Sequence, residues 1–150
     1  MLNRFGAFVA GITACYRYIQ RIKASEMTEL GLKGTHVMCL FYLHQHPQGL
    51  TAAQLCQLCG EDKAAMSRSL SELEARGYLQ TQLTDGKKYR AKIRLTALGI
   101  QAACKIDTLI QSWVAAGGDG LTEQERENFY VTLGQIADNL KSECKSKELL

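Results

Sequence analysis

A strict alternation of cationic and apolar residues over positions 88–95 limits the possible folds more than any other feature. Successive side chains of a β-strand point to opposite faces, so this segment is predicted to be a strand with one apolar and one cationic face. Asp85-Gly86 just before it is a hairpin turn signal, and residues 78–83 can supply the partner strand. The cationic face carries Lys88, Arg90, Lys92 and Arg94, and the apolar face carries Tyr89, Ala91, Ile93 and Leu95. Such a hairpin requires an anionic partner.

Two short helices are predicted immediately before this hairpin. The sequence Thr51-Ala-Ala-Gln54 is a capping box, and it opens a helix that ends at Gly60. Asp62 caps a second helix over residues 63–76, which Gly77 ends in the left-handed conformation. Two short helices about a tight turn, followed at once by a hairpin, make a winged helix-turn-helix. Its second helix can enter the major groove of DNA.

Longer helices are predicted on both sides of this motif. The first covers about residues 3–27, and the next begins near Thr35 and ends at His46-Pro47. Thr96 caps a helix that reaches the Gly-rich stretch 117–120, and Thr122 opens the last helix with a second capping box. One side of the helix after Thr96 would carry Leu98, Ala102, Ile106, Leu109 and Trp113. The fold class is therefore mainly α with a small β-hairpin wing (α+β).

Composition narrows the class of protein. A chain of 150 residues with 46% hydrophobic residues and one proline is predicted to be globular, and no run is long enough to span a bilayer. The net charge is only +3, but residues 96–150 hold five cations and eight acids, so the basic charge lies in the preceding part. The six cysteines mostly fall on apolar helix faces, where a thiol behaves as a small hydrophobe. A reduced, cytoplasmic protein is expected.

Three stretches of the sequence resemble the MarR family of bacterial transcription regulators. They are "LGLKGTHVMCLFYL" (30–43), "LTAAQLCQLCGEDKAAMSRSLSELEARGYLQ" (50–80) and "RLTALG" (94–99), and the likeness covers nearly the whole chain. The resemblance implies a winged helix-turn-helix DNA-binding domain at 31–96 and a helical dimerisation region at 1–30 and 97–150. Two departures stand out. The family usually has an apolar residue where Glu61 stands, and Lys87 and Tyr89 occupy the positions of its wing motif Asp-x-Arg.

Double-stranded DNA is the partner expected for the helix 63–76 and the wing. Arg68 can grip a guanine edge, serine hydroxyls can bind phosphate or base, small alanines allow close approach, and wing cations face phosphates and the minor groove. The expected DNA-binding residues are Thr35, Lys63, Ala64, Ala65, Ser67, Arg68, Ser71, Lys87, Lys88, Arg90 and Lys92. The competing interpretations are a solvated strand face, ordinary helix formers at the two alanines and a simple helix cap at Thr35.

The long terminal helices carry more apolar surface than one small winged domain can cover. Pairing two chains would bury Phe5, Phe8, Trp113, Phe129, Leu133 and Ile136 and would present two recognition helices to a palindromic operator. The resemblance implies a repressor that a small, often aromatic, anionic ligand releases from DNA. The candidate ligand-binding residues are Tyr16, Arg17, Tyr42, His46 and Trp113, each of which could equally be ordinary packing.

Other interpretations remain open at this stage. Cys15 on the first helix could make the protein a thiol-based redox-sensing regulator. A zinc set of Cys56, Cys59, His44 and His46 is disfavoured, because the family has alanine and a core leucine at the two cysteine positions; no metal or cofactor is expected. No nucleophile–base set indicates an enzyme. A winged-helix module that binds protein rather than DNA is the alternative from another class.

Overall fold

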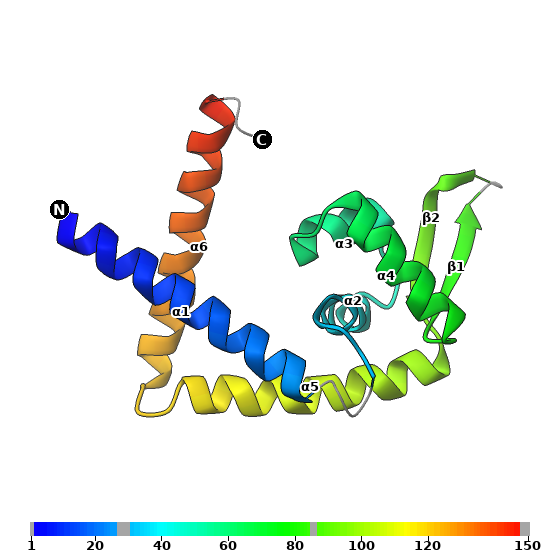
Figure 1. The fold of residues 1–150 in the computed structure, drawn as a ribbon, viewed down its shortest axis with the longest axis horizontal. Helices are drawn as coiled ribbons and strands as arrows, with labels where there is room; N and C mark the ends of the chain where they lie inside the picture. The colour runs from blue at the N-terminus through cyan, green and yellow to red at the C-terminus, as the bar shows by residue number, and fades with distance from the viewer. Residues whose placement is uncertain (1, 27–30, 85–86, 148–150) are drawn as a thin grey trace. The chain divides into compact units, whose positions relative to one another are not determined.

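The computed structural model describes the backbone of residues 2–26, 31–84 and 87–147 and the side chains of residues 3–25, 31–82 and 91–147. Six helices and two strands follow one another along this part of the chain (Figure 1). They are α1 (Leu2–Glu26), α2 (Gly34–Gln45), α3 (Ala52–Cys59), α4 (Lys63–Ala75), β1 (Leu79–Thr84), β2 (Lys87–Leu95), α5 (Ala97–Gly117) and α6 (Glu123–Ser146). The predicted mainly helical fold with a two-stranded wing is confirmed.

The chain forms two compact units. The first covers residues 1–109 and contains α1 to α4, the hairpin and the first part of α5. The second covers residues 110–150 and contains the end of α5 and α6. The winged helix-turn-helix lies wholly within the first unit.

Helix α2 occupies the centre of the first unit. Its side chains Val37, Cys39, Leu40 and Leu43 are almost completely buried, and α2 contacts α1, α3, α4 and β2. Leu55 of α3 and the Met66 and Leu73 side chains of α4 are fully buried in the same core. A leucine-sized side chain contributes about 1.5–3 kcal/mol when it is fully buried. The two short helices are therefore held by apolar packing on α2.

Local capping determines where the two short helices begin and end. Thr51 accepts the Gln54 N–H, and the Gln54 side chain accepts the Thr51 N–H at 2.9 Å, so the predicted capping box is present. Gly60 takes a left-handed conformation with a φ of 67° and ends α3. Two residues later, the Asp62 carboxylate accepts the Ala65 N–H at 2.8 Å and starts α4. The turn is thus fixed by its own sequence.

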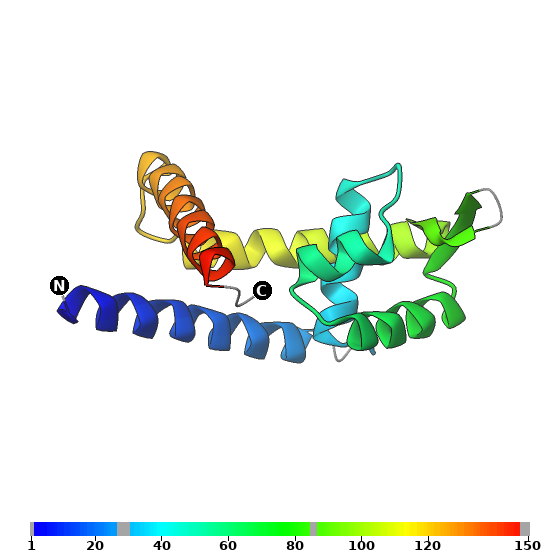
Figure 2. The same ribbon diagram turned by 90° about the horizontal axis from the view of Figure 1, so that it is seen from above.

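The hairpin is joined to the helix-turn-helix through the loop before α3. Strands β1 and β2 pair antiparallel, with Leu79 opposite Leu95 and an irregularity between residues 82 and 84. Leu50 exchanges two backbone hydrogen bonds with Ile93, at 3.1 and 2.8 Å, so the segment just before α3 borders β2. Strand β1 also contacts α4, and the hairpin lies beside that helix in both ribbon views (Figure 2). The hairpin and α4 are therefore packed against each other.

Helix α5 begins in close contact with the end of α4. The Thr96 hydroxyl donates to the Gly77 carbonyl at 2.6 Å and accepts the Gly99 N–H at 3.1 Å. A Cβ at position 99 would lie 2.1 Å from the Tyr78 carbonyl oxygen, so only glycine fits there. The face of α5 that is buried carries Gly99, Ala102, Ala103 and Ile106. Leu98, predicted to lie on the buried side, is 48% exposed, because the close approach at Gly99 turns the helix away from it.

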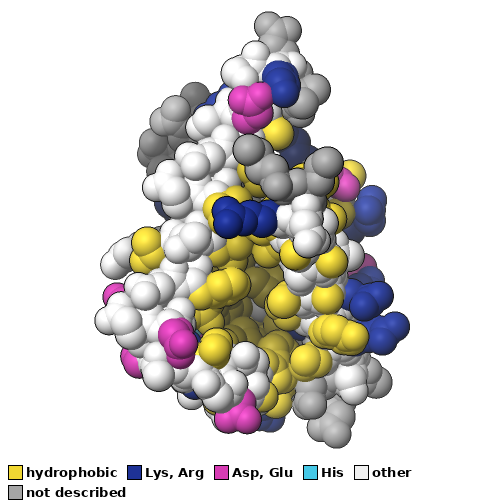
Figure 3. Space-filling model, turned by 90° about the vertical axis from the view of Figure 1, so that its left-hand side faces the viewer, with side chains coloured by type: hydrophobic (Ala, Val, Ile, Leu, Met, Phe, Trp, Pro, Cys, Tyr) yellow, Lys and Arg dark blue, Asp and Glu magenta, His cyan; other side chains and the backbone are white. Residues whose placement is uncertain are grey.

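The second unit is built around a long amphipathic helix. Thr122 and Glu125 form the predicted second capping box at the start of α6. The Arg126 guanidinium donates to the Gly118 carbonyl at 2.7 Å and closes the turn between α5 and α6. Among the described residues of α6, no side chain is fully buried, and large hydrophobic side chains lie open at the surface (Figure 3). No described helix combines the length and apolar character needed to cross a membrane.

The close approach at Gly99 yields a stability prediction. Gly99→Ala should lower the free energy of unfolding by about 2–3 kcal/mol, because the new methyl group overlaps the Tyr78 backbone and forces α5 outward. Gln101→Ala, at an exposed position two residues along the same helix, should change it by less than about 0.5 kcal/mol. Urea unfolding followed by circular dichroism measures both values. Equal stability of the two variants would contradict the packing described.

Candidate nucleic-acid interface

One face of α4 is open to solvent along its whole length. Lys63, Ala64, Ser67, Arg68 and Ser71 are exposed, and Ala65 is half-buried, so the six residues predicted to contact DNA from this helix share one accessible side. The opposite side carries Met66, Ser69 and Leu73, which are buried. This side presents two hydroxyls, a guanidinium and an ammonium group among small alanine side chains. Such groups are suited to hydrogen bonding with base edges and phosphates.

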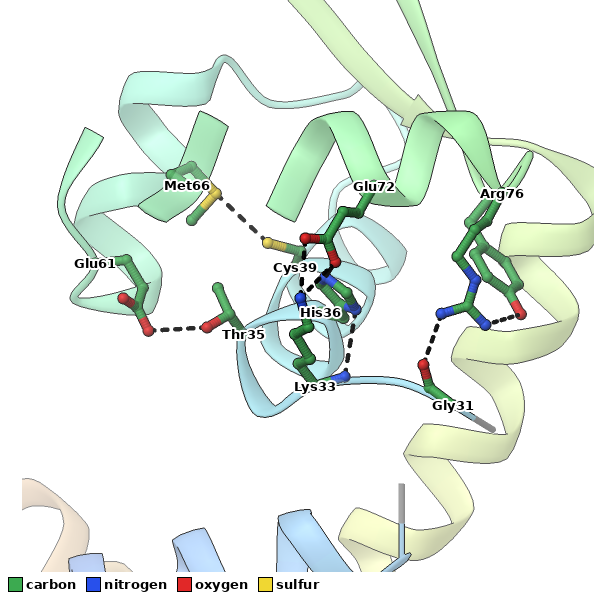
Figure 4. A network of polar contacts seen from close by, with 10 residues as sticks. Gly31, Lys33, Thr35, His36, Cys39, Glu61, Met66, Glu72 and Arg76 are labelled. Atoms are coloured by element: carbon green, nitrogen blue, oxygen red, sulfur yellow. Dashed lines mark hydrogen bonds and ion pairs between the residues drawn. The ribbon is translucent and has the colours of Figure 1, made fainter. Parts of the chain in front are cut away.

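The back of α4 is tied to the N-terminus of α2 by a polar network (Figure 4). The Lys33 ammonium donates to both carboxylate oxygens of Glu72, at 2.9 and 2.7 Å. This pair is exposed, so its contribution to stability is small. Lys33 nevertheless lowers the pKa of the Glu72 carboxyl, and its hydrogen bond to that carboxyl is the largest cause.

His36 is the buried member of this network. Its side chain is only 1% exposed, and its Nδ1 accepts the Lys33 N–H at 3.3 Å, so the ring takes the place that glutamate has in an ordinary capping box. The proton is therefore on Nε2, which lies 3.3 Å from a Glu72 oxygen without hydrogen-bonding geometry. Burial lowers the pKa of His36, and this effect exceeds the opposite effect of Glu72. The ring is neutral at physiological pH.

The C-terminal end of α4 is held by a second set of contacts. The Arg76 guanidinium donates to the Gly31 carbonyl at 2.7 Å and stacks over the Tyr78 ring at 5.1 Å. The Thr81 hydroxyl of β1 donates to Glu74 at 2.9 Å. These bonds fix α4 against both α2 and the hairpin while leaving its outer face unobstructed. None of these positioning residues was predicted from the sequence, where they look like an ordinary polar helix surface.

Two cationic side chains of β2 bind the backbone of the loop between α2 and α3. The Lys92 ammonium donates to the Gly49 carbonyl at 3.3 Å, and the Arg94 guanidinium donates to the Gln48 carbonyl at 3.2 Å. Both side chains are half-buried and bind the loop between α2 and α3. The side chains of Lys87, Lys88 and Arg90 lie outside the described residues. A role in DNA binding for these wing cations stays a prediction.

Thr35 and Glu61 are also linked. The Thr35 hydroxyl donates to the Glu61 carboxylate at 3.1 Å, which connects the first turn of α2 to the turn between α3 and α4 (Figure 4). The sequence predicts that Thr35 binds a phosphate, and the structure shows its hydroxyl already occupied by Glu61. The polar residue at position 61 thus has a structural partner.

The candidate effector-binding residues do not line a pocket that lies in the first unit. That pocket has a volume of about 270 Å³ and is lined by Leu43, His44, Pro47, Arg94, Leu95 and Ile100. Tyr16 and Arg17 are exposed on α1, and Tyr42 and Trp113 are half-buried. The exposed His46 lies 2.8 Å from the Tyr42 carbonyl through its Nδ1. His44 is not among the predicted effector-binding residues, but it lines this pocket and its ring lies 2.7 Å from the Asp107 carboxylate.

The cysteines are all free thiols. Cys15, predicted as a redox candidate, is exposed on α1, whereas Cys39 is buried and Cys56 and Cys59 are half-buried. In the part of the chain that the structure describes, no three His, Cys, Asp or Glu side chains are placed to hold a metal ion. The ring of His44 points to Asp107, away from a zinc set with Cys56 and Cys59.

A short helix pair, an exposed second helix and a β-hairpin joined to it define a winged helix-turn-helix, the fold class of many DNA-binding regulators. Comparison with known proteins shows which family this part of the chain is similar to. Residues 30–88 match the model of the MarR family. This match supports the predicted resemblance over the winged helix-turn-helix, the part of the chain that the family model covers.

Solved structures extend the likeness to nearly the whole chain. The transcriptional regulator SlyA is 21% identical, with a TM-score of 0.82 over 92% of this chain and 96% of its own. A MarR-family transcriptional regulator from Silicibacter pomeroyi is 26% identical, with a TM-score of 0.74 over 84% of this chain and 86% of its own. MepR of S. aureus in complex with DNA is 18% identical, with a TM-score of 0.76 over 86% of this chain and 93% of its own.

The buried His36 predicts a pH dependence of stability. The folded-state pKa of His36 lies below the ordinary value of 6.5, so between these two values the unfolded chain binds a proton that the folded chain does not. The free energy of unfolding should therefore fall as the pH falls below 6.5, by at most about 1.4 kcal/mol per pH unit. Urea titrations from pH 7.5 down to 5 measure it.

His36→Gln is the diagnostic variant, because glutamine can accept the Lys33 N–H but does not titrate. It should remove most of this pH dependence, whereas the exposed His46→Gln should leave it in place. An unchanged pH profile for His36→Gln would assign the effect to another group.

Proposed function

We propose that the protein is a cytoplasmic DNA-binding transcriptional regulator that acts as a homodimer on a palindromic operator. The observation that carries this proposal is the outer face of α4, which is accessible from Lys63 to Ser71 while the rest of the helix is fixed to α2 and the hairpin. A rigidly held helix with an open polar face is suited to the major groove. The similarity to MepR, which has been solved with DNA bound, supports this assignment.

The proposed contacts divide into reading and positioning. Arg68 reads a base edge, because a guanidinium fork can bind guanine in two places. Lys63, Ser67 and Ser71 bind phosphates or neighbouring bases, and the small side chains of Ala64 and Ala65 let the helix come close to the groove. The wing residues Lys87, Lys88 and Arg90 neutralise phosphates beside it, and Lys92 and Arg94 hold the loop between α2 and α3.

Dimer formation follows from apolar surface that a single chain leaves open. On α1, Phe5 is 69% exposed, and on α6, Phe129 and Val131 are 53% and 68% exposed. Soluble monomers rarely leave contiguous apolar faces of this kind uncovered. A second copy would bury them and, through two-fold symmetry, present two α4 helices to successive major grooves.

The regulator is proposed to act as a repressor, and a small aromatic or anionic effector would release it from DNA. An effector can act only through different affinities for the DNA-bound and free conformations. Arg94 and Leu95 of β2 line this pocket together with His44. A ligand held there would therefore contact one strand of the wing directly. Tyr16, Arg17, Tyr42, His46 and Trp113 remain further candidates for contact with such a ligand.

Arg68→Ala tests the proposed recognition helix. Using a duplex selected from a random pool by the wild-type protein, we expect this variant to bind at least about tenfold more weakly, since a good base contact contributes about 1–3 kcal/mol. Fluorescence anisotropy measures the Kd. Lys141→Ala, which removes a cation from the exposed surface of α6, is the matched control and should bind like the wild type.

A salt titration in the same assay separates DNA binding from a protein-binding winged-helix module. A DNA-binding dimer should show a steep fall in the logarithm of affinity with the logarithm of salt concentration. No enrichment of the duplex pool, and no binding at low salt, would reject the proposal and favour the protein-binding module.

Phe129→Asp tests the proposed dimer. A carboxylate at this exposed apolar position should raise the dimer dissociation constant about thirtyfold or more, equivalent to roughly 2 kcal/mol. Sedimentation velocity measures the change, and circular dichroism checks that the helix content is kept. Asp138→Ala, nine residues later and on the opposite side of α6, should leave the dimer intact. A wild-type protein that sediments as a monomer at micromolar concentration would refute the dimer.

A further inference from the structure

Two helices of the first unit bring a thiol, an imidazole and a carboxylate together, and we call them the Cys–His–Asp cluster: Cys104, His44 and Asp107. Cys104 and Asp107 lie three residues apart on α5, so they share one face of that helix. The His44 ring, from α2, contacts both. Its Nδ1 lies 2.7 Å from an Asp107 carboxylate oxygen, and its Nε2 lies 3.9 Å from the Cys104 sulfur. His44 is 60 or more positions away from both partners, so no local motif reveals the cluster.

The carboxylate determines which nitrogen of the His44 ring carries the proton. An ionised carboxylate can only accept hydrogen bonds, so the contact with Asp107 requires the proton of the neutral ring on Nδ1. Nε2 is then an acceptor and faces the Cys104 thiol. The other Asp107 oxygen is buried and has no hydrogen-bond partner among the described residues. In such an arrangement a histidine can take the proton of a nucleophile while the carboxylate stabilises the charged ring.

The cluster is open to small molecules on one side. Cys104 is exposed, and His44 lines the pocket of about 270 Å³. Ile100 lines the same pocket and lies one helical turn before Cys104 on α5. The remaining walls are mostly apolar, and Arg94 adds a positive charge. A short apolar group bonded to the Cys104 sulfur therefore has room beside the His44 ring.

We propose that Cys104 is a modification site that accepts a small acyl group from an acyl thioester, with His44 as general base and Asp107 as the residue that positions it. His44 takes the thiol proton on Nε2, and the sulfur attacks the carbonyl carbon of the donor. A C–S bond forms and the carbonyl electron pair moves onto oxygen. The carbonyl then re-forms, the bond to the departing sulfur breaks, and the imidazolium gives its proton to that thiolate. The products are S-acyl Cys104 and a free thiol, and nothing is oxidised or reduced.

The chemistry of the product selects the class of donor. Acylated Cys104 is itself a thioester, so a donor with a thiol leaving group exchanges its acyl group with little change in free energy. An ordinary oxygen ester or an amide is more stable than the product and is a poor donor. The pocket volume of about 270 Å³ is below that of sites for drug-sized ligands, which favours a short acyl chain or a single ring.

The position of Cys104 in the middle of a helix favours one stable modification over repeated turnover. Within α5 the backbone N–H groups are bonded to helix carbonyls, so the described backbone at Cys104 provides no pair of N–H groups for an oxyanion. Hydrolysis of the acyl group would pass through another oxyanion, with water as a weaker nucleophile than the thiolate. The acyl group should therefore stay on the sulfur, and this covalent mark does not depend on DNA binding.

Acetyl transfer to the full-length wild-type protein tests the site. The protein is incubated at neutral pH with the acetyl thioester of N-acetylcysteamine, with a phosphine present to prevent oxidation, and is then digested with trypsin. Cys104 and Cys15 fall on separate peptides, 95–105 and 5–17, each with one cysteine. Both cysteines are exposed, so Cys15 is the internal reference for a surface thiol.

Mass spectrometry of the two peptides gives both rates of acetylation. We expect Cys104 to react at least about tenfold faster than Cys15, because a positioned base contributes about 10²–10⁴ to the rate of a reaction. Neutral hydroxylamine should remove the acetyl group, as it does from thioesters. Equal rates for the two cysteines, or acetyl groups that resist hydroxylamine and lie on lysines alone, overturn the proposal.

Variants assign the roles within the cluster. Cys104→Ser should lose the fast acetylation, and His44→Ala should lower the rate at Cys104 to about that at Cys15. Asp107→Asn should give an intermediate rate, because the ring keeps a partner but loses the charge that stabilises the imidazolium. Circular dichroism checks that each variant is folded.

Rescue by a small molecule separates chemistry from structure. Free imidazole should raise the rate at Cys104 in His44→Ala, where the shortened side chain leaves room for it beside the pocket, more than it raises the rate at Cys15. His46→Gln is the matched control, because the exposed His46 contacts the Tyr42 carbonyl and should not affect Cys104. A rate at Cys104 that His44→Ala leaves unchanged, or that imidazole does not restore, overturns the role of His44.

Discussion

The winged domain keeps its shape because α2 buries one whole face beneath its neighbours. Val37, Cys39 and Leu40 have no exposed surface, and α1, α3, α4 and β2 all contact this helix. A core of this kind is close-packed, so a displacement of one helix is passed to the others and not absorbed by empty space. The direction of α4 is consequently determined by its packing on α2, and the polar network around His36 and Glu72 adds contacts at the edge of that core.

Features with local causes were predictable from the sequence. The caps at Thr51, Asp62 and Thr122 and the left-handed Gly60 and Gly77 lie where their neighbours require them, because each is decided by a few adjacent residues. The alternating strand and its partner also follow from local pattern. The open face of α4 was predicted for the same reason, since helical periodicity alone separates Arg68 from Met66.

Features with distant causes were not predictable. Alternation places Lys92 and Arg94 on one face of a strand, but it cannot show that the 48–50 loop lies against that face and takes up both side chains. Leu98 fits an apolar stripe, yet the backbone contact at Gly99 decides which side of α5 is buried.

The junction at Thr96 has a consequence for how movement travels through the first unit. Thr96 is bonded to the Gly77 carbonyl and caps the first turn of α5, and the Tyr78 carbonyl sits directly on Gly99. These three close contacts lie within one helical turn and hold the start of α5 rigidly against the base of the hairpin. A rotation of α5 would therefore move the hairpin and α4 together.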